Sequence, residues 1–198
     1  NMLQKGDSAI YGKLAVNQTV ADGGSQALTV NGAISSSGDL NVEGTSLIHY
    51  NNLDSGSFGT LHTYSADGNA QGDIVKFGTV NTGTMVAGQL YYLDTNGQWV
   101  LTNAGDNTAG ADELLAVALG DTPATHGMLL RGIVRLSVAP AASNLRGRAV
   151  YMHTTNGRAS TAAPSGNNNI VRIVGYLLNN TKKQIYFNPD STWVKVTT

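Results

Sequence analysis

The chain contains no cysteine among its 198 residues. This absence excludes disulfide bonds, thiolate metal ligands and cysteine nucleophiles, so packing and backbone pairing must hold the fold together. Charged residues are also scarce, at 13% of the chain, and the formal net charge is -1. Because nucleic-acid binding depends on many basic side chains that neutralise phosphates, we expect no nucleic-acid partner.

Long hydrophobic runs are absent as well. Apolar runs such as Met128-Leu129-Leu130 and the six residues 114–119 are far below the roughly 20 residues that span a bilayer, so we expect no membrane insertion. Residues 1–5 lack the features of a secretory signal, and we therefore expect that the printed sequence does not direct its own export. Glycine is abundant instead, with 24 residues, and together with Thr, Ser and Asn it indicates a polar but mostly uncharged surface.

Three short stretches near the N-terminus, at 14–17, 28–31 and 40–43, share a Leu-x-Val pattern that places two apolar residues at strand period. Each offers only two inward side chains, whereas folding must offset about 1 to 2 kcal/mol of backbone entropy for every ordered residue. We infer that identical neighbouring subunits supply the missing apolar surface. The prediction is an extended β stalk over residues 1–68. Its candidate subunit-interface residues are Leu14, Val16, Leu28, Val30, Leu40 and Val42.

From residue 69 onward, strand-like segments become denser, and we predict a β head over 69–198. Its strands are rich in β-branched and aromatic residues and are bounded by Gly, Asn, Asp and Pro. The predicted strands are 73–77, 90–93, 98–101, 114–119, 128–136, 149–153, 170–178, 184–187 and 192–196. The chain is therefore predicted to be all-β, with a stalk followed by a compact β-barrel or β-sandwich head.

The head contains internal sequence similarity, and the first pair of similar segments is 60 residues apart. The segment 91–98 resembles 151–158, and an Asn-Gly pair stands in each copy where a type I′ hairpin turn would form. The segment 114–119 is likewise echoed by 171–176. These echoes predict half-repeats of about 73–136 and 137–198; chance similarity among strand-rich segments is the alternative.

Catalytic and metal-binding patterns are not recognisable in the sequence. The four histidines are scattered, without the spacing of a helical zinc site, and are interpreted as surface or turn residues. Asp94, Asn96 and Gly97 resemble the start of a calcium loop, but position 103 is Asn where the loop needs a glutamate, which favours a hairpin turn. No Gly-x-Ser-x-Gly elbow occurs. We expect no enzymatic activity, no metal site and no cofactor.

All six arginines stand in the second part of the head, between positions 131 and 172. They could form a patch that binds an anionic glycan or an acidic neighbouring subunit, because guanidinium groups match carboxylates. The alternative is ordinary solubilising charge on strand faces. Most aromatic residues are expected to fill the core and the subunit contacts, with sugar stacking as the other interpretation. The surface-binding candidates are Arg146, Arg148, Arg158 and Tyr151.

Two parts of the chain resemble bacteriophage proteins. The low-charge stretch 28–42 looks like the connecting segments of tail fibres. The segments 171–176, 185–190 and 192–194 resemble the ends of fibre and appendage proteins of marine and cyanobacterial phages. Segments 87–92 and 115–120 are similar to matching parts of small β-barrel domains in phage capsid decoration proteins.

These resemblances imply a non-enzymatic virion protein, commonly trimeric, that is assembled in the host cytoplasm. The expected role is a homotrimeric tail fibre or spike component that contacts the host surface. Its expected partners are identical subunits, other virion proteins and a host glycan or protein. The alternative is a capsid decoration, or cement, protein that stabilises the phage shell. The resemblance carries no catalytic residues to this chain.

Overall fold

The computed structural model describes residues 64–106 and 109–197. The six predicted stalk residues from Leu14 to Val42 lie outside this part of the chain. Of the described residues, 39% lie in strands and 3% in helix, so the head is essentially all-β, as predicted. The elements are β1 (Ala70–Val75), β2 (Thr79–Val80), β3 (Leu90–Leu93), β4 (Gln98–Leu101), β5 (Leu115–Ala118), α1 (Pro123–His126), β6 (Met128–Arg135), β7 (Ala149–Met152), β8 (Ala159–Ser160), β9 (Ile170–Asn179), β10 (Gln184–Phe187) and β11 (Trp193–Lys195).

All nine predicted strands are present, with ends within a few residues of their predicted positions. Three elements were not predicted: the two-residue strands β2 and β8, and the single helical turn α1. The strands β2 and β8 are too short to carry an alternating pattern of their own and are defined by their partners β4 and β7. Helix α1 begins with Pro123, whose fixed φ and missing N–H suit a first helical position.

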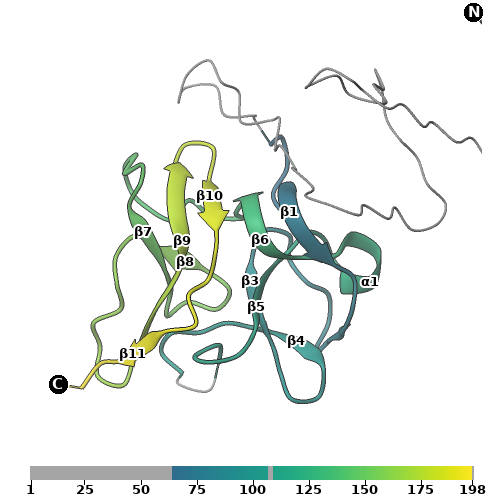
Figure 1. The fold of residues 1–198 in the computed structure, drawn as a ribbon, viewed down its shortest axis with the longest axis horizontal. Helices are drawn as coiled ribbons and strands as arrows, with labels where there is room; N and C mark the ends of the chain where they lie inside the picture. Colours follow the sequence, from purple (N-terminus) through teal and green to yellow (C-terminus); the bar gives the residue numbers. More distant parts are fainter. Residues whose placement is uncertain (1–63, 107–108, 198) are drawn as a thin grey trace, which may run out of the picture. The chain divides into compact units, whose positions relative to one another are not determined.

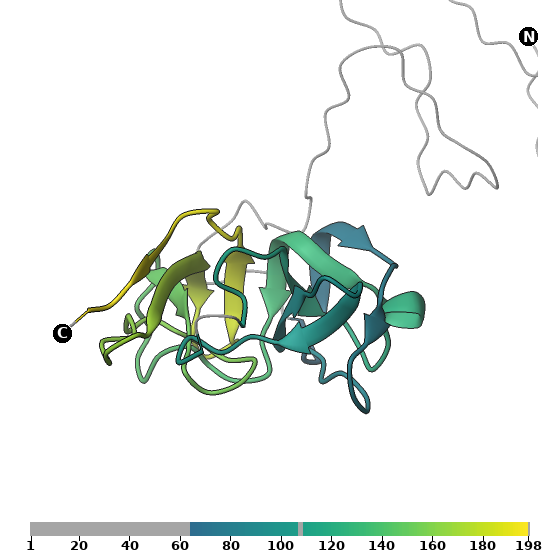
Figure 2. The same cartoon turned by 90° about the horizontal axis from the view of Figure 1, so that it is seen from below.

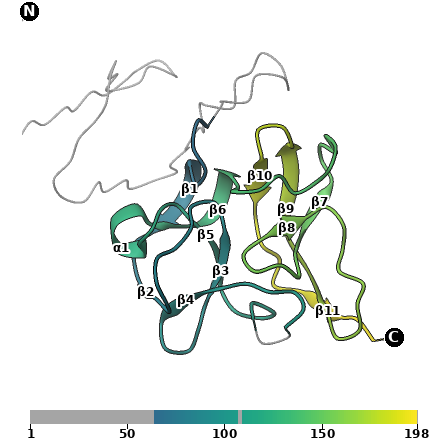
Figure 3. The same ribbon diagram turned by 180° about the vertical axis from the view of Figure 1, so that it is seen from behind.

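The strands form one mixed, open sheet in the order β2-β4-β3-β5-β6-β10-β9-β7-β8, with β1 also paired to β6 and β11 to β9 (Figure 1). Every pair is antiparallel except β2 with β4. The two longest strands, β6 and β9, each pair with three others. The other strands are thus connected through β6 and β9, and the same cartoon is seen from below and from behind in Figures 2 and 3.

The strands pair in the same order in the two parts of the head. The β3–β4 hairpin is followed by β5, which pairs with β3, and by β6, which pairs with β5. In the same way, the β7–β8 hairpin is followed by β9, which pairs with β7, and by β10, which pairs with β9. Strands β6 and β10 pair with each other and join the two sets. This common order supports the predicted half-repeats, which stay a prediction.

Both Asn-Gly pairs lie in hairpin turns, but the turns are not of the predicted type I′. A type I′ turn needs positive φ at both central residues. Gly97 and Gly157 have φ of +74° and +67°, whereas Asn96 and Asn156 are not among the non-glycine residues with positive φ. The Gly97 N–H donates to the Asp94 carbonyl, and the Asp94 N–H to the Gln98 carbonyl. This is the pattern of a three-residue loop that ends in a left-handed glycine.

The core extends over both faces of β5. Leu115 and Val117 belong to the larger buried cluster, and Ala116 and Ala118 to the smaller one around Trp99. A strand that is covered on both faces has apolar residues at every position and not at alternate ones, and residues 114–119 have this pattern. The larger cluster also contains buried residues of β7, β9 and β10, so the two sets of strands share one core.

Glycines occupy neighbouring positions across the centre of the sheet. In register, Gly72 of β1 faces Gly132 of β6, Gly132 faces Phe187 of β10, and Phe187 faces Gly175 of β9. The three glycines have φ between +144° and +155°, and a Cβ on any of them would lie 2.0 to 2.1 Å from a carbonyl oxygen of the neighbouring strand. Backbones therefore approach here more closely than a side chain allows.

Alkaline conditions should weaken the head through its buried tyrosines. Burial raises the pKa of Tyr91, against a smaller opposing effect of the hydrogen bond from the Val86 N–H, 2.9 Å from the phenol oxygen. The folded state therefore holds the phenol proton more tightly than the unfolded chain, whose tyrosine pKa is near 10. This contribution to the free energy of unfolding is fully present below about pH 10 and is lost as pH rises through the folded pKa. Urea unfolding at about pH 8 and pH 11 should show a smaller alkaline loss in Tyr91→Phe than in the wild type. Equal losses would contradict this.

Candidate functional site

The four predicted surface-binding residues all lie on or beside the β7–β8 hairpin. Arg146 and Arg148 are exposed in the segment before β7, Tyr151 is half-buried on β7, and Arg158 is exposed just before β8. The His153 N–H donates to the Arg158 carbonyl, so Arg158 lies five residues along the hairpin from Arg148. At strand rise this is about 17 Å. The structure therefore places the arginines at opposite ends of β7 and does not gather them into one cluster.

Arg158 lines a surface groove along β8, which we call the β8 groove. Its walls are residues 138–142 on one side and 158–162 on the other, with His153 at one end, and its volume is about 270 Å³. The Thr161 N–H donates to the Pro140 carbonyl at 2.9 Å and holds the two walls together. A second groove of about 230 Å³, which includes residues 163–166, adjoins it and shares His153, Ser160 and Ala162.

The β8 groove combines apolar walls with hydrogen-bond donors. Alanines and Pro140 supply most of its apolar surface, whereas Arg158, Ser160 and Thr161 contribute polar groups. His153 Nδ1 accepts a hydrogen bond from the Thr155 N–H at 2.9 Å, which assigns the proton of the neutral ring to Nε2. The Arg158 guanidinium and the His153 Nε2–H are therefore two donors on the lining of this groove.

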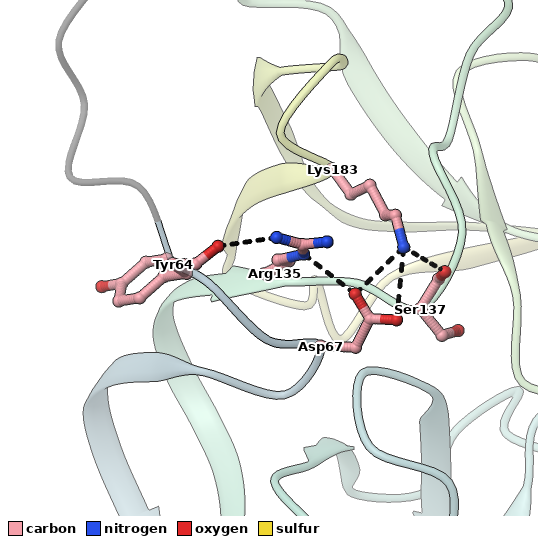
Figure 4. Close-up of polar contacts among 5 residues, drawn as sticks. All are labelled: Tyr64, Asp67, Arg135, Ser137 and Lys183. Atoms are coloured by element: carbon pink, nitrogen blue, oxygen red, sulfur yellow. Dashed lines mark hydrogen bonds and ion pairs between the residues drawn. The ribbon is translucent and has the colours of Figure 1, made fainter.

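A second polar centre, the Asp67 cluster, joins the first described residues to the head (Figure 4). Asp67 forms ion pairs with Arg135 at 2.9 Å and with Lys183 at 3.0 Å. Arg135 also donates to the Tyr64 carbonyl, and Lys183 to the Ser137 carbonyl, at 2.7 and 2.8 Å. The three charged residues come from positions up to 116 residues apart, so sequence spacing does not reveal the cluster.

The backbone strengthens the same junction. The Gly68 N–H donates to the Arg135 carbonyl, and the Arg135 N–H donates to the Asn69 carbonyl. Tyr64 is 8% exposed, and burial raises its pKa. Residues 64–69 are therefore attached to β6 and to the turn at Lys183 by main chain, side chain and packing together.

Removing the charge of Asp67 should loosen this junction. Asp67→Asn leaves Arg135 and Lys183 partly buried without their carboxylate, and we expect a loss of about 1 to 2 kcal/mol in the free energy of unfolding. Thermal and urea unfolding measure it. Asp73→Asn, the same change at an exposed position of β1, is the control and should stay within about 0.5 kcal/mol. An equal effect of the two substitutions would show that the cluster does not stabilise the head.

Arg172 on β9 is a structural arginine. It is 5% exposed, and its Nη1 donates to the carbonyls of Gly110, Ala111 and Glu113 at 2.9 to 3.0 Å, while Nε donates to the Asp190 carbonyl at 2.8 Å. Burial lowers its pKa, and the nearby carboxylates oppose that change. Of the six arginines considered for a binding patch, Arg135 and Arg172 thus stabilise the fold from partly or fully buried positions.

The other sequence candidates have local roles in the described residues. The Asp94 carboxylate accepts hydrogen bonds from the Asn96 and Gln98 N–H groups at 2.9 and 2.7 Å, as expected of a hairpin turn. His126 Nδ1 lies 2.9 Å from an Asp121 oxygen on the surface, and His49 and His62 lie outside the described residues. Within residues 64–106 and 109–197, no group of three or more His, Asp or Glu residues could hold a metal ion.

Among the described elements, no helix is long and apolar enough to cross a membrane. Comparisons of this chain with protein-family models, with curated proteins and with solved structures find no match.

Proposed function

We propose that the chain is a non-enzymatic structural protein of a bacteriophage virion: a homotrimeric tail fibre or spike component whose β head contacts the host surface. The resemblances of segments 28–42, 171–176, 185–190 and 192–194 to fibre proteins motivate this role. In the proposed assembly, residues 1–68 form the trimeric stalk, and Leu14, Val16, Leu28, Val30, Leu40 and Val42 lie in subunit contacts. Other virion proteins hold the stalk, and the protein is assembled in the host cytoplasm.

The observation that carries this proposal is the Asp67 cluster. A fibre must transmit force between its stalk and its head, so the connection between them cannot be a free linker. Residues 64–69 are bound to β6 and to Lys183 by two ion pairs and two main-chain hydrogen bonds. Such an attachment supports a stalk that enters the head at a fixed point.

Two finer features of the head belong to the same proposal. One is the origin of the head from half-repeats of about 73–136 and 137–198, supported by the common strand order. The other is a compact barrel or sandwich form, supported by buried clusters on both faces of β5.

The oligomeric state of the full chain tests the fibre role. Light scattering coupled to size-exclusion chromatography should give three times the chain mass of 20.6 kDa at micromolar concentration. A monomer at that concentration would overturn the proposal, because the six stalk residues would then have no partner subunits.

The second candidate is a capsid decoration protein that locks neighbouring capsomers. It is favoured by β11, which among the described strands pairs only with β9 and carries Trp193 and Val194 at 36% and 60% exposure. Exposed apolar residues on such an edge strand suit pairing with another protein. Gold-labelled antibody against the head should mark tails if the chain is a fibre component, whereas label over the shell would replace that role with decoration.

A further inference from the structure

The β8 groove has a counterpart at the matching position in the other set of strands. There, residues 80–84 lie along β4 and enclose a groove of about 260 Å³, as residues 138–142 do along β8. The Asn81 N–H donates to the Trp99 carbonyl, and the Thr161 N–H to the Pro140 carbonyl. Each groove thus lies between the second hairpin strand and the segment that precedes the hairpin.

The residues at matching positions of the two grooves differ in size and charge. The backbone pair Asp94–Gln98 in the first hairpin corresponds to His153–Arg158 in the second. Trp99, which faces Leu93, corresponds to Ala159, which faces Met152. At these matching backbone positions the first hairpin has an acidic residue, a neutral residue and a fully buried indole, where the second has a histidine, an arginine and a methyl group.

Both walls of the β8 groove come from a stretch of chain without acidic residues. Between Asp121 and Asp190 the sequence contains no acidic residue, but it contains all six arginines and two lysines. Arg135, Arg172 and Lys183 are engaged by the fold, as described above. In the part of the chain that the structure describes, no hydrogen bond or ion pair engages the Arg158 guanidinium, which is exposed at the groove.

We propose that the β8 groove binds a carboxylate-bearing sugar, with Arg158 as the anion-binding residue. The guanidinium fork pairs with the carboxylate, and the His153 Nε2–H is a second donor. The Ser160 hydroxyl, whose oxygen accepts from the Ala162 N–H, keeps its proton to donate to the sugar ring, and the Thr161 hydroxyl, which donates to the Pro140 carbonyl, keeps its oxygen as an acceptor. The adjoining groove extends the surface to further sugar units. This ligand class rests on the proposed host-surface role for its biological setting.

Calorimetric titration of the full chain at low ionic strength tests the ligand. The probes are an oligosaccharide of uronic acid units, the same oligosaccharide with its carboxyl groups reduced to alcohols, and acetate. We expect the acidic oligosaccharide to bind, and the reduced form and acetate to bind at least about tenfold more weakly, because one lacks the charge and the other the sugar. Equal binding of the reduced form, or no binding of any probe, would overturn the proposal. Equal binding of acetate would overturn its sugar part.

Two variants test the residue. Arg158→Gln should weaken binding of the acidic oligosaccharide about tenfold or more, whereas Arg148→Gln, at the other end of β7, should change it less than about twofold. Both positions are exposed, so both variants should fold, and thermal unfolding checks this before the titrations. If both substitutions weaken binding equally, the effect is general surface charge and the assigned site is wrong. If the chain is a trimer by light scattering but does not bind the sugar, only this inference is overturned. If it is a monomer that binds the sugar, only the fibre role is overturned.

Discussion

Replacing Gly175 with alanine should destabilise the head by about 3 kcal/mol or more, enough to lower the melting temperature by about 10 °C. The new Cβ would lie 2.0 Å from the Tyr186 carbonyl oxygen on β10, and φ at this position is +155°. Because the clash is with backbone, a rotamer change cannot relieve it. Strands β9 and β10 would have to separate, and Phe187 between Gly132 and Gly175 would lose its packing.

Gly147→Ala is the matched control for this prediction. Gly147 also has a left-handed φ, of +77°, but a Cβ there would meet no atom within 4 Å. Gly147→Ala should destabilise the head only by the conformational cost of a non-glycine residue at a left-handed φ, about 1 to 2 kcal/mol. Urea unfolding compares the two variants. Similar losses for both would mean that conformation alone, and not the close approach of β9 and β10, requires glycine in the sheet.

Replacing Arg172 with glutamine should cost about 3 kcal/mol in the free energy of unfolding. The two hydrogens of Nη1 face three carbonyl oxygens, and Nε binds a fourth, so one side chain satisfies four main-chain acceptors from two loops. Glutamine is too short to reach all of them, and buried carbonyls without donors remain. We expect β9 to lose its attachment to both loops.

Arg146→Gln provides the comparison, because Arg146 is exposed and the substitution is the same. It should change stability by less than about 0.5 kcal/mol. Arg172→Lys should fall between the two variants, since a lysine keeps the charge but has one nitrogen in place of the fork. Denaturant unfolding measures all three. If Arg172→Gln and Arg146→Gln are equally stable, the four hydrogen bonds contribute nothing net to folding.

The candidate site was only partly predictable from the sequence. Arg158 could be chosen because arginines gather in the second part of the head. The groove beside it could not, because its walls come from segments about 20 residues apart that meet through the Thr161 to Pro140 hydrogen bond. The Asp67 cluster was missed for the same reason, since nothing in local spacing relates Asp67 to Lys183.

The sequence by itself determined nine strands of the head, all but the two-residue strands β2 and β8, because alternation, β-branched content and turn residues are local properties of the chain. It also determined the basic character of residues 122–189. Only the tertiary structure decided which arginines are free to bind and which are buried, and where glycine is required by a neighbouring strand. Those properties depend on contacts between distant residues, such as Arg172 with Gly110 and Gly175 with Tyr186, which pairing and packing bring together.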